Sequence, residues 1–92
     1  MVETIHKYPL NVEALPTIKM PAGAQVLCVQ VQKGAPCLWA IVDPDQPLEY
    51  RYFRVCGTGY GFGMDRTNSR YIGTFQLDEG AFVGHVFELE RR

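Results

Sequence analysis

The chain has 92 residues, of which 47% are hydrophobic and 21% are charged, and its nine basic and ten acidic side chains give a formal net charge of −1. This composition excludes intrinsic disorder, and the length fits one domain over residues 1–92, since roughly 100 residues is a common domain size. The balanced charge excludes an electrostatic surface for DNA, and no apolar run approaches the roughly 18 residues of a membrane span, so we expect neither partner.

The first predicted strand covers residues 4–10, with Ile5 and Lys7 on one face and Thr4, His6 and Tyr8 on the other. Pro9 cannot donate to a β-ladder, so this strand is predicted to lie at the edge of a sheet. Residues 17–20 form a second short strand, and residues 21–24 form a turn that leads into the next strand.

Residues 25–33 and 36–43 form the predicted central hairpin, joined at Gly34-Ala35. Alternation in its first strand places three aliphatic residues in the core: Leu27, Val29 and Val31. The second strand is apolar on both faces, which predicts a central position with cover on both sides. Trp39 in that strand is interpreted as a core residue, with an interface anchor as the alternative.

The last three predicted strands are residues 48–56, 71–77 and 82–89, and Asp78–Gly80 is the turn between the final pair. No segment shows a helical period over ten residues. The total of seven short strands with turns between them predicts an all-β fold, either a small antiparallel sandwich or a barrel.

Three cysteines, Cys28, Cys37 and Cys56, lie within the strand patterns. Their odd number favours small buried hydrophobic residues in a reducing, cytoplasmic compartment over a Cys28–Cys37 disulfide. No metal site is expected, because the chain lacks a C-x-x-C pair and its two histidines are far from any ligand spacing. No cofactor is expected either.

Several short segments together resemble a family of small single-domain proteins common in phage genomes and in bacterial genomes that carry prophages. The matching segments are Ile5-His-Lys-Tyr-Pro-Leu10, Met20-Pro-Ala-Gly-Ala24, Val29-Gln-Val-Gln32, Pro36-Cys-Leu-Trp-Ala40, Val42-Asp-Pro44, Gly57-Thr-Gly59, Tyr71-Ile-Gly-Thr74 and His85-Val-Phe-Glu88. The resemblance covers nearly the whole chain and implies a phage or prophage origin, but no activity. Members of that family often have a histidine after Gly-Thr-Gly, where this chain has Tyr60.

The segment Gly57-Thr-Gly-Tyr-Gly-Phe-Gly63 is the most unusual local feature. Glycines allow positive φ, and successive backbone N–H groups in such a segment line concave nests that bind anions. A dinucleotide-binding loop would need a helix after it, and no helical pattern follows here. A bulged connection between strands therefore remains the favoured interpretation, with a ligand-binding loop as the alternative.

Four arginines and several aromatic residues surround this segment in the sequence, a combination that suits a nucleotide, since guanidinium groups bind phosphate and aromatic rings stack on bases. An ordinary solvated strand face is the competing interpretation. The predicted ligand-binding residues are Arg51, Arg54, Gly57, Thr58, Gly59, Tyr60, Gly61, Arg66 and Arg70.

No catalytic residues are predicted, because the chain has no G-x-S-x-G segment and no cysteine with a convincing histidine partner. His85 shares its strand face with Val83, Phe87 and Leu89 and is interpreted as a satisfied core residue.

With the resemblance, these features predict a non-catalytic phage accessory protein that counters host defence in the host cytoplasm. It would act by sequestering a nucleotide signal or by binding a host defence protein. The alternative is a structural module that assembles with itself or with particle proteins. The thin core and the weakly protected edge strand predict a homo-oligomer, with a dimer favoured.

Overall fold

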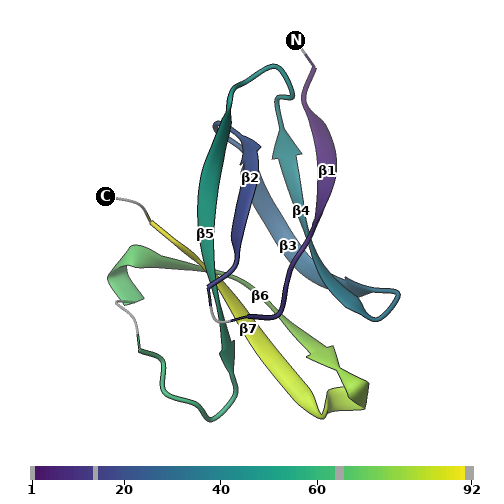
Figure 1. Cartoon of the computed structure of the whole chain (residues 1–92), viewed down its shortest axis with the longest axis vertical. Helices are drawn as coiled ribbons and strands as arrows, with labels where there is room; N and C mark the ends of the chain where they lie inside the picture. Colours follow the sequence, from purple (N-terminus) through teal and green to yellow (C-terminus); the bar gives the residue numbers. More distant parts are fainter. Residues whose placement is uncertain (1, 14, 64–65, 91–92) are drawn as a thin grey trace.

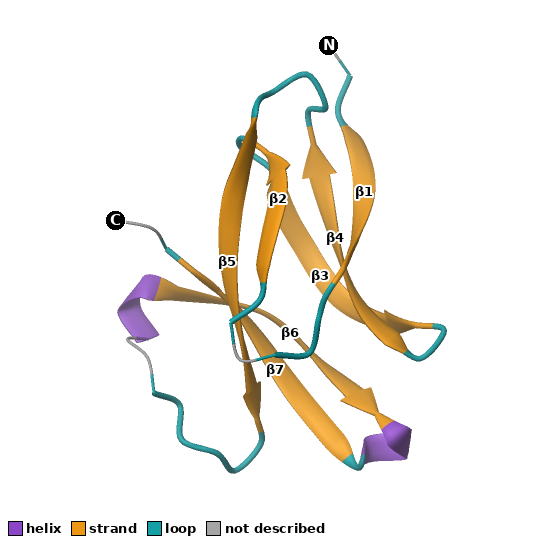
Figure 2. Cartoon of the chain, in the orientation of Figure 1, coloured by secondary structure: helices purple, strands orange, loops and turns teal. Residues whose placement is uncertain are grey.

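The computed structural model describes residues 2–13, 15–63 and 66–90, and it confirms the all-β prediction (Figures 1 and 2). The seven strands are β1 (Thr4–Pro9), β2 (Thr17–Pro21), β3 (Gln25–Gln32), β4 (Ala35–Val42), β5 (Leu48–Gly57), β6 (Ser69–Leu77) and β7 (Phe82–Leu89). Two 3-10 turns, η1 (Arg66–Asn68) and η2 (Asp78–Gly80), precede and follow β6. The strands thus begin and end within about two residues of the predicted positions.

Two antiparallel sheets make up the molecule, one in the order β1-β4-β3 and the other in the order β2-β5-β7-β6. They pack as a sandwich whose shortest dimension is 16 Å, as expected for two layers roughly 10 Å apart. The sheets are not closed into a barrel, so β1, β3, β2 and β6 are all edge strands. The predictions that the first strand lies at an edge and that β4 is central are both confirmed.

The β3–β4 hairpin turns at Lys33-Gly34, one residue earlier than predicted. Both residues have positive φ, 53° and 80°, which is the backbone of a two-residue type I′ turn. This turn matches the natural twist of the two strands, so Gln32 pairs directly with Ala35.

The core lies between the two sheets. Six of its residues are completely buried and come from four different strands: Met20, Leu38, Ala40, Val42, Phe53 and Val86. β4 contributes Leu38, Ala40 and Val42, and the facing sheet contributes Phe53 at its centre.

Leu27 and Val31 are not core residues, contrary to the prediction from alternation, and of the three predicted residues only Val29 is buried. A bulge between Val26 and Cys28 shifts the register by one residue, so Val26 and Val29 are buried while Leu27 is 41% exposed. A one-residue slip reverses the faces of a strand, and strict alternation cannot anticipate it.

Trp39 is likewise not in the core. It lies on the outer face of β4, the face opposite Leu38 and Ala40, and is half-buried there because no third layer covers the three-stranded sheet. The expectation of cover on both faces of β4 is therefore wrong, although its central position in the sheet is right.

All three cysteines are free, and only Cys37 is buried. Cys28 and Cys56 are half-buried, so the prediction of three buried hydrophobic residues holds for one of them. The described residues contain no helix of the length and apolarity that crossing a membrane would require.

Gly84 on β7 is required by the core packing. A Cβ atom at this position would lie 2.7 Å from Cζ of Phe75, whose side chain is only 3% exposed and cannot move away. We expect Gly84→Ala to lower the free energy of unfolding by about 1–3 kcal/mol, as overpacked cores do. Urea denaturation measures this loss. Gly61→Ala is the control, because a Cβ there would meet nothing within 4 Å; equal losses in the two variants would contradict the packing argument.

Candidate functional site

The Gly57–Gly63 segment leaves β5 through a tight turn. The Tyr60 N–H donates to the Gly57 carbonyl at 3.2 Å, and Gly59, with φ of 89°, occupies the position of a type II turn that favours glycine. The Thr58 N–H donates to the Val83 carbonyl at 3.2 Å. Two of the N–H groups that an anion nest would need are therefore engaged in the fold, and Gly59 serves the turn.

After the turn, the segment crosses the outer face of the four-stranded sheet. The Phe62 ring packs edge-on against Phe87 of β7, with centroids 5.1 Å apart. On the other side Tyr71 of β6 packs against the same ring at 5.5 Å. Phe87 faces outward because its neighbour Val86 is completely buried in the core. The result is an aromatic cluster on the outer surface of the sheet.

His85 lies at the centre of a chain of hydroxyl groups on the same face. Its Nε2 is 2.6 Å from Thr58 Oγ1 in the loop, and its Nδ1 is 2.9 Å from Thr74 Oγ1 on β6. The Thr74 hydroxyl is also bonded to the Tyr71 hydroxyl. A hydroxyl group can donate or accept, so this chain accommodates either neutral tautomer of the imidazole.

A pocket of about 410 Å³ opens between the loop and the sheet. It is lined by Cys56, Gly57, Thr58, Gly59, Tyr60, Phe62, Tyr71, Thr74, His85 and Phe87. Aromatic rings supply its apolar walls, and the hydroxyl–imidazole chain supplies its polar groups. None of these lining residues carries a carboxylate, an ammonium or a guanidinium group.

Four of the nine predicted ligand-binding residues line this pocket: Gly57, Thr58, Gly59 and Tyr60. Arg54 lies near this pocket, because it is directly opposite Phe87 on the neighbouring strand. Its guanidinium group is also close to Gly63, since a Cβ atom added to Gly63 would lie 3.2 Å from Arg54 Nη2. Gly61 belongs to the loop but does not line the pocket, and Arg66 is an exposed residue of η1.

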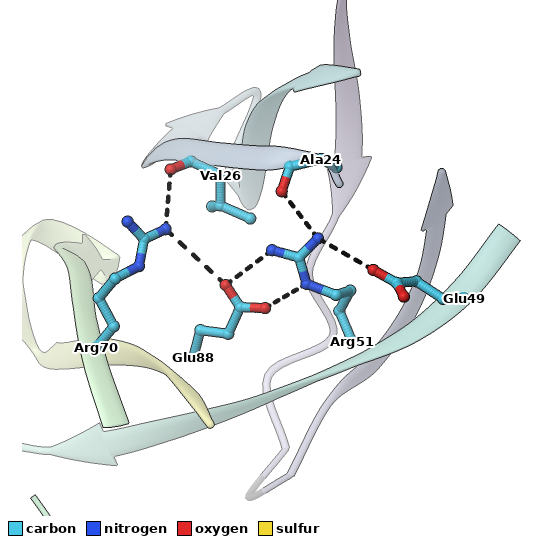
Figure 3. A network of polar contacts seen from close by, with 6 residues as sticks. All are labelled: Ala24, Val26, Glu49, Arg51, Arg70 and Glu88. Atoms are coloured by element: carbon cyan, nitrogen blue, oxygen red, sulfur yellow. Dashed lines mark hydrogen bonds and ion pairs between the residues drawn. The ribbon is translucent and has the colours of Figure 1, made fainter. Parts of the chain in front are cut away.

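Arg51 and Arg70 are not part of this pocket, contrary to the prediction, because they lie on the opposite face of the sheet, between the two layers (Figure 3). Arg51 forms a bidentate ion pair with Glu88 of β7, and its Nη1 donates to the Ala24 carbonyl at 2.9 Å. Arg70 donates to the Val26 carbonyl of β3 at 3.2 Å and lies 3.9 Å from Glu88. The physical reason is the alternation of β5, which sends Arg51 inward and Arg54 outward.

This group, Arg51, Arg70, Glu88 and Glu49, forms an ion network within the four-stranded sheet, on the face that is turned to the other sheet. The side chains of Arg51 and Glu88 are only 15% and 12% exposed. The hydrogen bond to Glu88 raises the pKa of Arg51, burial opposes that rise, and the negative charges of Glu88 and Glu49 add to it. The network borders an open cleft of about 570 Å³, but all three hydrogen-bonding nitrogens of Arg51 already have protein partners. Its two arginines link the four-stranded sheet to the other layer through the carbonyls of Ala24 and Val26.

His85 and Thr74 were missed as site residues. The interpretation of His85 as a core residue is wrong, because His85 lies half-buried on the outer face with both ring nitrogens bonded to hydroxyls. A signal for this existed in the sequence: a hairpin closed at Asp78–Gly80 that pairs Leu77 with Phe82 also pairs Thr74 with His85. Among the described residues, no group of three or more His, Cys, Asp or Glu side chains is arranged to hold a metal ion.

Comparison with known proteins identifies one family model, described as a domain of unknown function, that matches residues 1–92. No curated protein and no solved structure matches the chain.

Proposed function

The chain belongs to the DUF7352 family, whose description names no activity, and we propose from the chemistry of its pocket that it is a non-catalytic binding protein for a nucleotide. The base would enter the pocket under the Gly57–Gly63 segment, and the phosphate would remain outside. The observation that carries this proposal is a pocket with aromatic walls and a hydroxyl–imidazole chain, whose lining residues include no carboxylate, ammonium or guanidinium group.

The pocket chemistry suits a nucleobase. A flat ring can stack on the aromatic side chains of Phe62, Phe87 and Tyr71, and such stacking contributes roughly 1–3 kcal/mol per base. Thr58 and Thr74 present hydroxyl groups that can donate to or accept from the polar edge of a base. An uncharged base is favoured over a phosphate inside, because burying an anion without a cation beside it is costly.

Arg54 is the candidate phosphate ligand. It faces outward beside Phe87, close to the Gly63 end of the loop. Among the described residues Arg54 forms no ion pair, unlike Arg51 and Arg70, and its planar guanidinium group suits a phosphate. Of the four arginines first predicted, it is the one whose position fits this role.

Binding is favoured over catalysis because both ring nitrogens of His85 are held by threonine hydroxyls, and no acid or lysine lines the pocket to assist a proton transfer. A protein that sequesters its ligand needs affinity and no turnover. With the resemblance to phage proteins, this supports a phage accessory protein that removes a nucleotide signal from host defence in the host cytoplasm. Capture of a host protein is the competing role.

Calorimetry against nucleosides, linear nucleotides and cyclic nucleotides tests the proposal. We expect at least one nucleotide to bind the wild type with a dissociation constant below about 100 μM. Thr74→Val should weaken binding about tenfold, because it removes a hydroxyl that both holds His85 and faces the base. Arg54→Ala should weaken the binding of nucleotides but leave the binding of nucleosides unchanged.

Arg66→Ala is the matched control, because this exposed arginine lies outside the pocket. If no nucleotide or nucleoside binds the wild type more tightly than about 100 μM, the proposal is wrong and a protein partner should be sought. If nucleotides bind but Arg54→Ala and Arg66→Ala have equal effects, Arg54 is not the phosphate ligand.

A further inference from the structure

Strand β1 is exposed on both of its faces and along its outer edge. Thr4, Ile5, His6 and Lys7 are all exposed, and Ile5 keeps 57% of its surface in contact with solvent. Figure 1 shows β1 at the margin of the molecule, paired on one side with β4 and with no strand beyond it. A strand that contributes so little to the core leaves a row of unpaired backbone groups that can pair with another strand.

The backbone of β1 has a defined orientation at this edge. The Leu10 N–H donates to the Pro36 carbonyl at 3.0 Å, on the β4 side. Backbone groups alternate in direction along a strand, so those of Tyr8, His6 and Thr4 also point to β4. Those of Pro9, Lys7 and Ile5 point to the free edge. Pro9 thus has its nitrogen on the unpaired side, where no hydrogen bond is lost.

We propose that β1 pairs antiparallel with β1 of a second copy of this chain, with Ile5 opposite Ile5 at a two-fold axis. The N–H and C=O of Ile5 in each copy would bond to those of Ile5 in the other. The Lys7 N–H of each copy would donate to the Glu3 carbonyl of the other. The two three-stranded sheets would join into one six-stranded sheet.

Side-chain chemistry selects this register. On the outer face, Glu3 of one copy lies opposite Lys7 of the other, and this pairing occurs twice around the central Ile5 pair. On the inner face, Thr4 lies opposite His6, and Val2, which is 80% exposed in the single chain, lies opposite Tyr8. Opposite charges placed directly across two strands are stabilising, and apolar side chains opposite each other bury surface.

The neighbouring registers place less complementary residues opposite each other. Matching faces require shifts of two residues, so the alternatives are centred on Thr4, His6 or Lys7. Centring on His6 places Glu3 opposite Pro9, which has no N–H to donate. Centring on Lys7 places two lysines opposite each other, and centring on Thr4 places Glu3 opposite Ile5. Only the Ile5 register pairs both charges, and this self-complementarity favours a second copy over an unrelated partner strand.

The interface is small, so we expect a dissociation constant in the micromolar range. Sedimentation between 1 μM and about 500 μM, concentrations that bracket this range, should show the mass rising from 10.4 kDa towards twice that value. Glu3→Lys or Lys7→Glu should each raise the dissociation constant about tenfold, because each creates two like-charge pairs. The double variant, with both substitutions, should restore it to within about threefold of the wild type.

Two controls separate the interface from the fold. Gln32→Ala removes the Lys7 Nζ contact within the chain, which spans 2.7 Å, and should leave the dimer intact. Ile5→Pro removes an N–H at the free edge and should give a folded monomer, whereas His6→Pro removes one that points to β4 and should destabilise the fold.

In the wild type, the amides of Ile5 and Lys7 should become protected from hydrogen exchange only as concentration rises.

A wild type that remains monomeric across the whole concentration range would overturn the proposal. A dimer that forms equally well in the single charge variants, or that fails to return in the double variant, would overturn the Glu3–Lys7 register. Nucleotide binding is independent of this result, because the pocket lies on the other sheet.

Discussion

Replacing Glu88 by alanine is expected to lower the free energy of unfolding by about 2 kcal/mol, below the range for breaking a fully buried ion pair, because Arg51 and Glu88 are only partly buried. Glu88 accepts two hydrogen bonds from Arg51, and both side chains are largely excluded from solvent. Without Glu88 the guanidinium would keep only the Ala24 carbonyl as a well-placed acceptor, because the Glu49 carboxylate is 3.8 Å away and more exposed. Urea denaturation of wild type and variant measures the loss.

Two matched variants test the cause. Arg70→Ala should cost less than about 1 kcal/mol, because the Arg70 side chain is 53% exposed and lies 3.9 Å from Glu88. The double variant Arg51→Met with Glu88→Leu should lie close to the wild type, since an apolar pair of similar volume avoids the desolvation of both charges. If Glu88→Ala costs no more than Arg70→Ala, the Arg51–Glu88 ion pair does not contribute the stability expected of it.

The contribution of Arg51 to the free energy of unfolding should not change with pH near neutrality. Its pKa is raised in the folded protein, chiefly by the hydrogen bond to Glu88. A raised pKa means that the folded state holds the proton more tightly, so the stability that it contributes is complete below the ordinary arginine pKa and is lost only in strong alkali. Unfolding free energies measured at pH 7 and pH 9 should therefore show no loss from this residue.

Replacing Leu38 by alanine is expected to cost about 2–5 kcal/mol, the range for truncating a fully buried leucine. Leu38 is completely buried at the centre of the three-stranded sheet and belongs to the main core cluster. Removing its side chain leaves a cavity that the other residues of the close-packed core cluster, such as Phe53 and Val86, cannot easily fill. Chemical denaturation again provides the measurement, and an unchanged m-value would show that the native fold persists.

Ile41→Ala is the matched control, because it removes a side chain of the same size from the same strand. Ile41 lies on the outer face and is only half-buried, so its loss should cost about 1 kcal/mol. Equal costs at the two positions would mean that the outer face of the three-stranded sheet is covered in solution, for instance by another copy of the chain.

The stability of the fold and the chemistry of the pocket occupy opposite faces of the same sheet. Phe53, Val86 and Glu88 point inward to the core and the ion network, while Arg54, His85 and Phe87 point outward to the pocket. Substitutions in the pocket can therefore be interpreted as effects on binding, provided that the unfolding transition is measured beside them.

The strands and most turns could be predicted from the sequence by itself because their signals are local. A period of two in the hydrophobic pattern is a property of consecutive residues, and so is the turn chemistry at Asp78–Gly80 and around Gly34, although the second turn lies one residue earlier than predicted. Part of the pocket could also be predicted from the sequence, since the Gly57–Tyr60 turn is built from neighbouring residues.

The tertiary structure alone decided which side of each strand has a function. Whether Trp39 is covered depends on the presence of a second layer, and whether Leu27 is buried depends on a bulge that only the paired strand reveals. Arg51 and Arg54 are three residues apart, yet one joins two sheets and the other faces the pocket, because strand alternation separates them. His85 gained its two hydroxyl partners from a loop and a neighbouring strand that are distant in the chain. Such contacts depend on how strands pair and stack, which no single segment encodes.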